Sequence, residues 1–453
     1  MSGPLRLLPG EGGDLPVLPR PRKNRARPSW AADPTDELAE RLVEQISTAV
    51  HPYEVAALLE SDGLTAEQIE RRYGRPDLFT LAEDLHHRVP RHYPEPPPAP
   101  DPWRPDSLRC ALRGLVFALP GLAYVLGAGL WQGAADLTGL VAAALLAWAF
   151  NQGLSHRAYL RLAAEGPAGA ARALRLGAPA GALAAAGAGL LLSGFSTAGA
   201  FAVSQSLYLG AASVLLVLGR ERALLLTLLP VAAGAGATTL WQLPTALVLT
   251  LLLGTVVLAA GVAGHTLHTA ARAGGSGGDA PAQALHRSLP YGLFGLAAAV
   301  LAALAGAEDP RAVIVLTLSM GFAEWLLYRF RSLAVAALRA STTPRGFALR
   351  AGRALGLCLG AYLALLAAGA VLARTAPVPL LALGAVFWTA LLLQAFSVAW
   401  PSAAVTLAAA AAESGALLAE LPPGPVQSIC PALAAAALTA GACRLLGRPA
   451  AHR

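Results

Sequence analysis

Two acidic side chains stand within long apolar stretches, and they are the groups of this sequence best suited to chemistry. Glu413 lies within residues 408–415, and Glu324 lies five residues before Arg329. Charge inside hydrocarbon is costly, and acids kept there commonly serve ion, proton or substrate pathways. Glu413 has no cation near it in the sequence, so burial would favour its protonated form and suit proton or sodium coupling, or substrate contact. Hydrogen bonding between helices or a shallower position is the alternative for Glu413, and pairing with Arg329 is the alternative for Glu324.

Four neutral amides form a second set of candidate side chains. Asn151 and Gln152 belong to a polar group at the end of one apolar stretch, which suits a gate between helix groups or ordinary solvation at the membrane surface. Gln205 and Gln394 stand among aromatic and small residues, where amides commonly hydrogen-bond neighbouring helices. We treat all four as candidate substrate-contact or packing groups.

Arg109 and Arg113 enter the first apolar stretch. Arginine can bind a phosphate with two parallel hydrogen bonds, so this pair suits the mouth of a cavity that takes a pyrophosphate-linked substrate. The alternative is that both side chains reach out to lipid headgroups.

No catalytic or metal-site pattern accompanies these residues. Cys110, Cys358, Cys430 and Cys443 form no Cys-x-x-Cys pair or Cys/His cluster, so we expect free thiols. Neither a Walker A sequence nor a serine- or zinc-hydrolase signature occurs. We therefore expect no enzyme activity, no cofactor and no metal.

The composition is typical of a membrane protein. The 453 residues are 55% hydrophobic and 13% charged, with a mean hydropathy of +0.54, whereas soluble domains carry about 25% charged residues. The net charge of +7 follows the arginines around the apolar stretches, so we expect membrane lipid and no nucleic acid as partner. Lys23 is the one lysine among 34 Lys and Arg residues, a bias typical of GC-rich, especially actinobacterial, genomes.

Apolar stretches follow one another from about residue 108 onward. Each is about long enough to cross a ~30 Å hydrocarbon core as a helix of about 20 residues. We predict twelve transmembrane helices, at residues 110–131, 137–157, 173–195, 198–219, 222–241, 243–267, 289–307, 311–331, 354–373, 378–400, 403–421 and 426–446.

Arginine is distributed unevenly between the loops that these spans imply. With the N-terminus inside, the external loops contain only Arg311 and Arg374, and the other loop arginines fall on the cytosolic side. Cytosolic loops carry the excess of Lys and Arg in membrane proteins. We therefore predict a multi-pass protein of the cell membrane with both termini cytoplasmic.

Three segments precede the membrane part. Residues 1–33 are rich in Pro, Gly and Arg and predict a disordered basic arm. Residues 34–92 show amphipathic patterns and a capping box of Thr65 with Gln68, and they predict a small cytosolic helical domain that binds a cytosolic protein. Its four short helices are expected at residues 36–50, 52–62, 65–74 and 76–89. Residues 93–107 form a Pro-rich linker.

The membrane part divides into two halves. A Gly-rich cytosolic linker at residues 268–288 separates six spans at 108–267 from six at 289–453. Two lobes related by a pseudo-twofold axis are a recurrent transporter plan. The predicted fold is therefore all-α and polytopic, with about 12 transmembrane helices in two six-helix lobes plus a small N-terminal cytosolic helical domain.

The segment Ala149-Phe-Asn-Gln-Gly-Leu-Ser-His-Arg, continuing to Arg175, resembles the junction of the second and third helices in the multidrug/oligosaccharidyl-lipid/polysaccharide flippase superfamily, which includes exopolysaccharide exporters. With the span count and the 6+6 division, the resemblance covers roughly residues 108–448. It implies two bundles around a central V-shaped cavity and alternating access by rocking of the lobes. The expected function is transport of an amphipathic substrate, a lipid-linked glycan or exopolysaccharide precursor, across the plasma membrane. The resemblance transfers no individual functional residue, and the N-terminal extension departs from the usual pattern.

Two other functions fit the same sequence. One is a cation-coupled multidrug antiporter. The other is a non-transporting scaffold whose cytosolic domain recruits partners for envelope synthesis or cell division. The small external loops argue against a membrane glycosyltransferase or polymerase.

Overall fold

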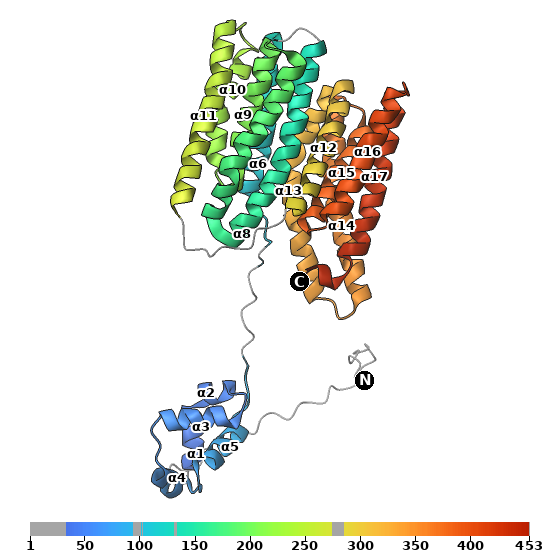
Figure 1. Cartoon of the computed structure of the whole chain (residues 1–453). Helices are drawn as coiled ribbons and strands as arrows, with labels where there is room; N and C mark the ends of the chain where they lie inside the picture. Colours follow the sequence, from blue (N-terminus) through green and yellow to red (C-terminus); the bar gives the residue numbers. More distant parts are fainter. Residues whose placement is uncertain (1–32, 94–100, 102, 131–133, 274–284, 453) are drawn as a thin grey trace, which may run out of the picture. The chain divides into compact units, whose positions relative to one another are not determined.

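The computed structural model describes residues 33–93, 101, 103–130, 134–273 and 285–452. Within these residues the secondary structure is helical, without strands. The chain divides into two compact units, Met1–Pro100 and Asp101–Arg453 (Figure 1). The predicted arm up to residue 32, and most of the two predicted linkers, at residues 94–100 and 274–284, lie outside the described residues.

The described part of the first unit is a set of short capped helices. The capping box predicted from the sequence is present, because the Thr65 hydroxyl accepts from the Gln68 amide and the Gln68 side chain accepts from the Thr65 amide. The single helix predicted at 36–50 is instead two, because the backbone leaves the helical region at Leu42. The helices are α1 (Pro34–Arg41), α2 (Val43–Thr48), α3 (Pro52–Ser61), α4 (Ala66–Tyr73) and α5 (Leu78–Arg88).

This unit has its own apolar core. α3 packs on α5, and Leu59, Leu81 and Leu85 between the helices are fully buried. Arg88 at the end of α5 donates hydrogen bonds to Asp33 and Asp36 at the start of α1. Apolar burial and ion pairing therefore hold the first and last helices together.

Ten helices among the described residues are long and apolar enough to cross a membrane, all of them in the second unit. This is the architecture of a multi-pass membrane protein. α6 and the short α7 together make one of the ten, and α10 is not among them. The helices of the second unit lie close to the predicted spans, with the bounds α6 (Ser107–Ala118), α7 (Gly121–Leu126), α8 (Ala134–Ser193), α9 (Thr197–Val217), α10 (Glu221–Ala237), α11 (Thr245–Arg272), α12 (Leu289–Glu308), α13 (Pro310–Arg339), α14 (Pro344–Ala373), α15 (Pro377–Ala395), α16 (Ala399–Leu418) and α17 (Pro423–Leu446).

The count of ten differs from the predicted twelve at two helices. α10 has 17 residues, a length of about 25 Å at 1.5 Å per residue. α8 covers two predicted spans, and at Gly166 its backbone is not helical (φ 69°, ψ −166°). The two arms of α8 fold back on each other, since a Cβ added at Gly177 or at Gly181 would collide with Leu154 or Phe150 of the first arm. The number twelve stays a prediction.

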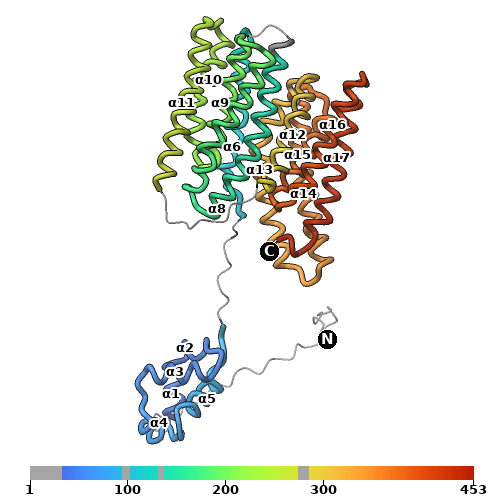
Figure 2. The backbone as a smooth tube through the Cα atoms, in the orientation of Figure 1, coloured from blue at the N-terminus to red at the C-terminus, as the bar shows by residue number. Residues whose placement is uncertain are grey.

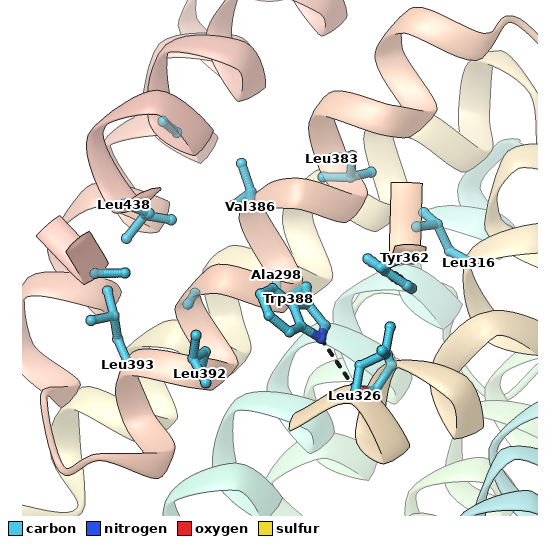
Figure 3. Close-up of a cluster of buried hydrophobic side chains, with 14 of the residues drawn as sticks. Ala298, Leu316, Leu326, Tyr362, Leu383, Val386, Trp388, Leu392, Leu393 and Leu438 are labelled. Atoms are coloured by element: carbon cyan, nitrogen blue, oxygen red, sulfur yellow. Dashed lines mark hydrogen bonds between the residues drawn. The ribbon is translucent and has the colours of Figure 1, made fainter. Parts of the chain in front are cut away.

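The long helices gather in two groups, α6–α11 and α12–α17 (Figures 1 and 2). Each group has apolar cores formed from its own residues. In the second group, the fully buried Trp388 donates from its indole nitrogen to the Ala323 carbonyl oxygen, surrounded by leucines of neighbouring helices (Figure 3). Each group therefore has an extensive apolar core of its own.

The order of packing repeats between the groups. In the first group α11 packs on α8, α9 and α10, α9 also contacts α8 and α10, and α6 lies against α10. In the second group α17 packs on α14, α15 and α16, α15 also contacts α14 and α16, and α12 lies against α16. These contacts correspond when α6 is matched with α12, α9 with α15, α10 with α16 and α11 with α17.

The arginine distribution predicts opposite compartments for two loops. A reporter fused within residues 274–280 should be cytosolic, and a reporter fused within residues 308–311 should be external, because one span separates them. A fusion after Arg448 serves as the control and should match the first. Activity of alkaline phosphatase and fluorescence of a cytosol-active reporter measure this, and finding both loops in one compartment would contradict the topology.

A buried histidine predicts pH-dependent stability of the first unit. Burial, and then the charge of Arg91, lower the pKa of His86 below its ordinary value of about 6.5. The unfolded chain therefore binds a proton that the folded unit does not, so stability should fall as the pH drops below about 6.5. Thermal unfolding of a 33–93 fragment, followed by circular dichroism, should show a lower midpoint at pH 5.5 than at pH 7.5.

The matched variants are His86→Leu and His87→Leu, since His87 is the exposed neighbour. The drop in midpoint should shrink in His86→Leu and persist in His87→Leu. An unchanged drop in His86→Leu would show that another group controls the transition.

Candidate functional site

Four charged side chains from three helices form a continuous ion-pair chain. Arg109 and Arg113 lie one turn apart on α6, which places them on the same helix face. Both donate to Oε1 of Glu221 at the start of α10, with Arg109 Nη2 at 3.1 Å and Arg113 Nε at 3.0 Å. Arg113 Nη1 also donates to Oε1 of Glu324 on α13. Arg113 thus joins the first helix group to the second.

The centre of this chain is shielded from solvent. The side chains of Arg113, Glu221 and Glu324 are 15%, 9% and 20% exposed, whereas Arg109 is 51% exposed. A buried charge must be matched by an opposite charge and hydrogen bonds, and removing one partner of a buried pair typically costs about 3–5 kcal/mol. Of the two arginines, Arg113 is therefore the one whose removal should destabilise the protein more.

The structure gives these predicted residues different partners from those considered in the sequence. Glu324 pairs with Arg113, 211 positions away, and Arg329, five positions away, is not its partner. Glu221 was not singled out in the sequence. The local signal for it was an acid between Arg220 and Arg222 at the start of a span.

Small residues let the two groups approach at two crossings. On α6 and α13, a Cβ on Gly114 would lie 3.0 Å from the Gly321 Cα. On α8 and α12, a Cβ on Gly292 would lie 3.2 Å from the Ala149 carbonyl oxygen. The first crossing pairs α6, the first helix of its group, with α13, the second helix of the other group. The second crossing pairs α12, the first helix of its group, with α8, the second helix of the other.

A histidine adds polar and ring contacts to the second crossing. His156 Nδ1 lies 3.1 Å from the Ser288 hydroxyl, and its ring stacks on Tyr291 with centroids 3.6 Å apart. Both crossings and the ion-pair chain lie toward the same end of the helices, where α6 and α12 begin. We call this the arginine-rich end, because Arg109, Arg220, Arg287 and the C-terminal ends of α13 and α17 belong to it.

The four candidate amides are dispersed. Asn151 accepts a hydrogen bond from the Ser213 hydroxyl of α9 at 3.3 Å, and Gln152 packs beside Gly295 of α12. Gln205 accepts from the Tyr124 hydroxyl at 2.6 Å. Gln394 is buried at the end of α15, and its Nε2 has no hydrogen-bond partner among the described residues. Of these four amides, Asn151 and Gln152 lie on α8, which contacts α12 of the other group.

Glu413 lies apart from the ion-pair chain, on α16. It is 2% exposed, and its Oε2 atom has no hydrogen-bond partner in the described part of the chain. It is five residues from the C-terminal end of α16, or about 7–8 Å along the axis. The carboxyl group is therefore buried without a cation among the described residues, and it lies in the C-terminal half of α16.

A second arginine links the segment before α6 to the second group. The Arg331 guanidinium lies 4.0 Å from the ring centre of Trp103 and 4.8 Å from that of Phe396, and it donates to the Ala395 carbonyl oxygen. An arginine between two aromatic faces gains cation–π attraction. The entry to α6 is thereby fixed to the ends of α13 and α15.

Comparison with family models, with curated proteins and with solved structures returned no match.

The ion-pair chain predicts an order of destabilisation. Arg113→Ala should lower the free energy of unfolding by about 3–5 kcal/mol, because it leaves Glu221 and Glu324 without their shared cation. Arg109→Ala should cost clearly less, since Arg109 is half-exposed. Unfolding in detergent, followed by circular dichroism, measures both.

Arg329→Ala is the matched control, because it removes the arginine nearest to Glu324 in sequence while leaving the observed pair intact. It should change stability little. If it cost as much as Arg113→Ala, the assignment of Glu324 to Arg113 would be wrong.

Proposed function

We propose that this chain is an alternating-access transporter that moves an anionic, lipid-linked glycan precursor across the membrane. The observation that carries the proposal is the repeated order of packing in α6–α11 and α12–α17. Two structurally related groups facing each other are the architecture in which one group can rock against the other around a central substrate. A scaffold has no need of such a repeat.

The contacts between the groups fit a barrier that opens and closes. The Arg113–Glu324 pair, the His156–Ser288 contact and the glycine crossings lie toward the arginine-rich end. In an alternating-access cycle the groups are in contact at the closed end and apart at the other. We therefore interpret this conformation as closed at the arginine-rich end, which is the predicted cytosolic side.

Unsatisfied arginine nitrogen near this barrier favours an anionic substrate. Arg157 follows His156 on α8, and its Nη1 is buried with no hydrogen-bond partner among the described residues. Arg109 is half-exposed at the edge of the ion-pair chain. Guanidinium groups bind phosphate with charge-assisted hydrogen bonds. A phosphate or pyrophosphate headgroup would satisfy Arg157 when the barrier opens, and Arg109 would attract it at the edge of the ion-pair chain.

Glu413 supplies a group that can couple transport to protons. A carboxyl that is buried without a cation is most stable when protonated and must be hydrated to ionise. If α16 becomes hydrated in one conformation and buried in the other, Glu413 takes up a proton on one side and releases it on the other. This role assigns the coupling to the second helix group.

The function is tested by flipping in proteoliposomes. Vesicles containing the full chain and a nitrobenzoxadiazole-labelled polyprenyl-diphosphate sugar should lose more fluorescence to external dithionite than protein-free vesicles, and an imposed pH gradient should increase the difference. Glu413→Gln should abolish the effect of the gradient. Glu420→Gln, which alters an exposed acid just beyond the same helix, should retain it.

Fluorescence loss equal to that of protein-free vesicles, from protein that shows a normal unfolding transition, would contradict the transporter proposal and favour the scaffold. Flipping that proceeds normally in Glu413→Gln would remove only the coupling role.

A further inference from the structure

Two aromatic side chains form an exposed pair on the N-terminal unit. Tyr53 on α3 and Phe79 on α5 are 66% and 59% exposed, and their rings meet edge to face with centroids 5.8 Å apart. The ring of His51 lies 4.6 Å from that of Tyr53, and the neighbouring Val50 is 70% exposed. We call these four residues the aromatic patch.

Such a patch indicates a binding surface. Exposed apolar residues scattered singly are normal, but contiguous ones mark sites that contact another segment or protein. Tyr and Phe can each bury about 150–250 Å² in a contact. The helices below are already packed and capped, so these rings contribute little to the unit's own core.

The charge around the patch defines what can bind there. Residues 33–93 contain 13 Asp and Glu against six Arg, a net charge of −7, although the whole chain carries +7. Glu60 lies two turns after Tyr53 on α3, and Glu83 lies one turn after Phe79 on α5. Spacings of four and seven residues place these exposed acids on the same helix faces as the aromatic rings. The patch therefore suits a segment that is apolar at one end and basic at the other.

The chain itself contains such a segment. Residues 15–27 read Leu-Pro-Val-Leu-Pro-Arg-Pro-Arg-Lys-Asn-Arg-Ala-Arg, with three large aliphatic side chains followed by five cations and no acid. Pro-rich sequences favour an extended conformation, and proteins commonly bind them on aromatic surfaces. The aliphatic residues of this segment match the aromatic rings of the patch, and the cations that follow match the acids further along α3 and α5.

We propose that residues 15–27 bind the aromatic patch of the same chain, with Leu15, Val17 and Leu18 against Tyr53 and Phe79 and the cations against the surrounding acids. The length of chain permits this. Six peptide units separate Arg27 from Asp33 at the start of α1, a reach of about 20 Å. Phe79 lies nine residues before Arg88 on α5, about 14 Å along the axis, and Arg88 donates to Asp33, so the patch is within reach of the arm.

An intramolecular complex of this kind has a regulatory consequence. A short tether gives an effective concentration in the millimolar range, so a modest affinity keeps the patch occupied. The five cations of the same arm would also attract anionic lipid headgroups. The arm cannot occupy the aromatic patch and a membrane surface at the same time. Attraction of the arm to lipid would therefore free the patch for another partner.

The proposal is tested with a fluorescein-labelled peptide of residues 15–27 and the chain lacking residues 1–32, in a neutral detergent. Fluorescence anisotropy should show saturable binding that weakens with added salt. The double variant Tyr53→Ala/Phe79→Ala should bind about tenfold more weakly. Val43→Ala is the matched control, since Val43 is 44% exposed on α2 outside the patch, and it should bind like the parent.

Two further measurements identify the occupant. The full chain should bind the labelled peptide more weakly than the truncated chain, because its own arm competes. A peptide in which the five cations are replaced by Ser should not bind. This test leaves the protein unchanged, so it does not depend on the folding of a variant. Equal affinity of the full and truncated chains would overturn the intramolecular complex, and unchanged affinity of the Tyr53→Ala/Phe79→Ala variant would overturn the site.

Discussion

A charge that is buried among apolar helices has to be neutralised by a side chain from another helix, and the arrangement of the membrane unit depends on this constraint. Arg113 meets it by contacting Glu221 of α10 and Glu324 of α13 at once. The cost of leaving any of the three unpaired is large, so α6 is fixed to a helix of its own group and to a helix of the other group. The glycines at the two crossings allow the backbones to come close enough for these contacts. Electrostatics and close packing therefore act at the same end of the molecule.

The same constraint explains how the two helix groups could move. Each group has its own apolar core, so rigid-body motion would leave those cores intact. The contacts between the groups contain more polar and small residues, such as His156, Ser288 and Gly321, and they can be exchanged for water or substrate at a lower cost than a leucine core. We propose that the groups separate along this boundary. The reversibility of this separation is what the transport proposal requires.

Much of the fold could be predicted from the sequence, because hydropathy and caps are local signals. Apolar runs of about 20 residues located the long helices, and Thr65 with Gln68 located the start of α4. The tight reversal of α8 at Gly166 and the break at Leu42 depend on backbone conformations that composition does not reveal. The site was harder to predict because Arg113 and its two partners are 108 and 211 positions apart. Sequence proximity instead suggested Arg329 for Glu324, and nothing in a single sequence indicates that Glu221 faces α6.

Alternating access requires the two helix groups to separate at the arginine-rich end. Double electron–electron resonance between spin labels tests it most directly, with labels on cysteines at the exposed positions Arg175 of α8 and Arg345 of α14, in a chain whose four native cysteines are replaced by Ala. We expect two distance populations, with the longer one increased by Glu324→Gln because that change weakens the Arg113 ion pair joining the groups. A single narrow distance that is the same with and without Glu324→Gln would contradict this separation.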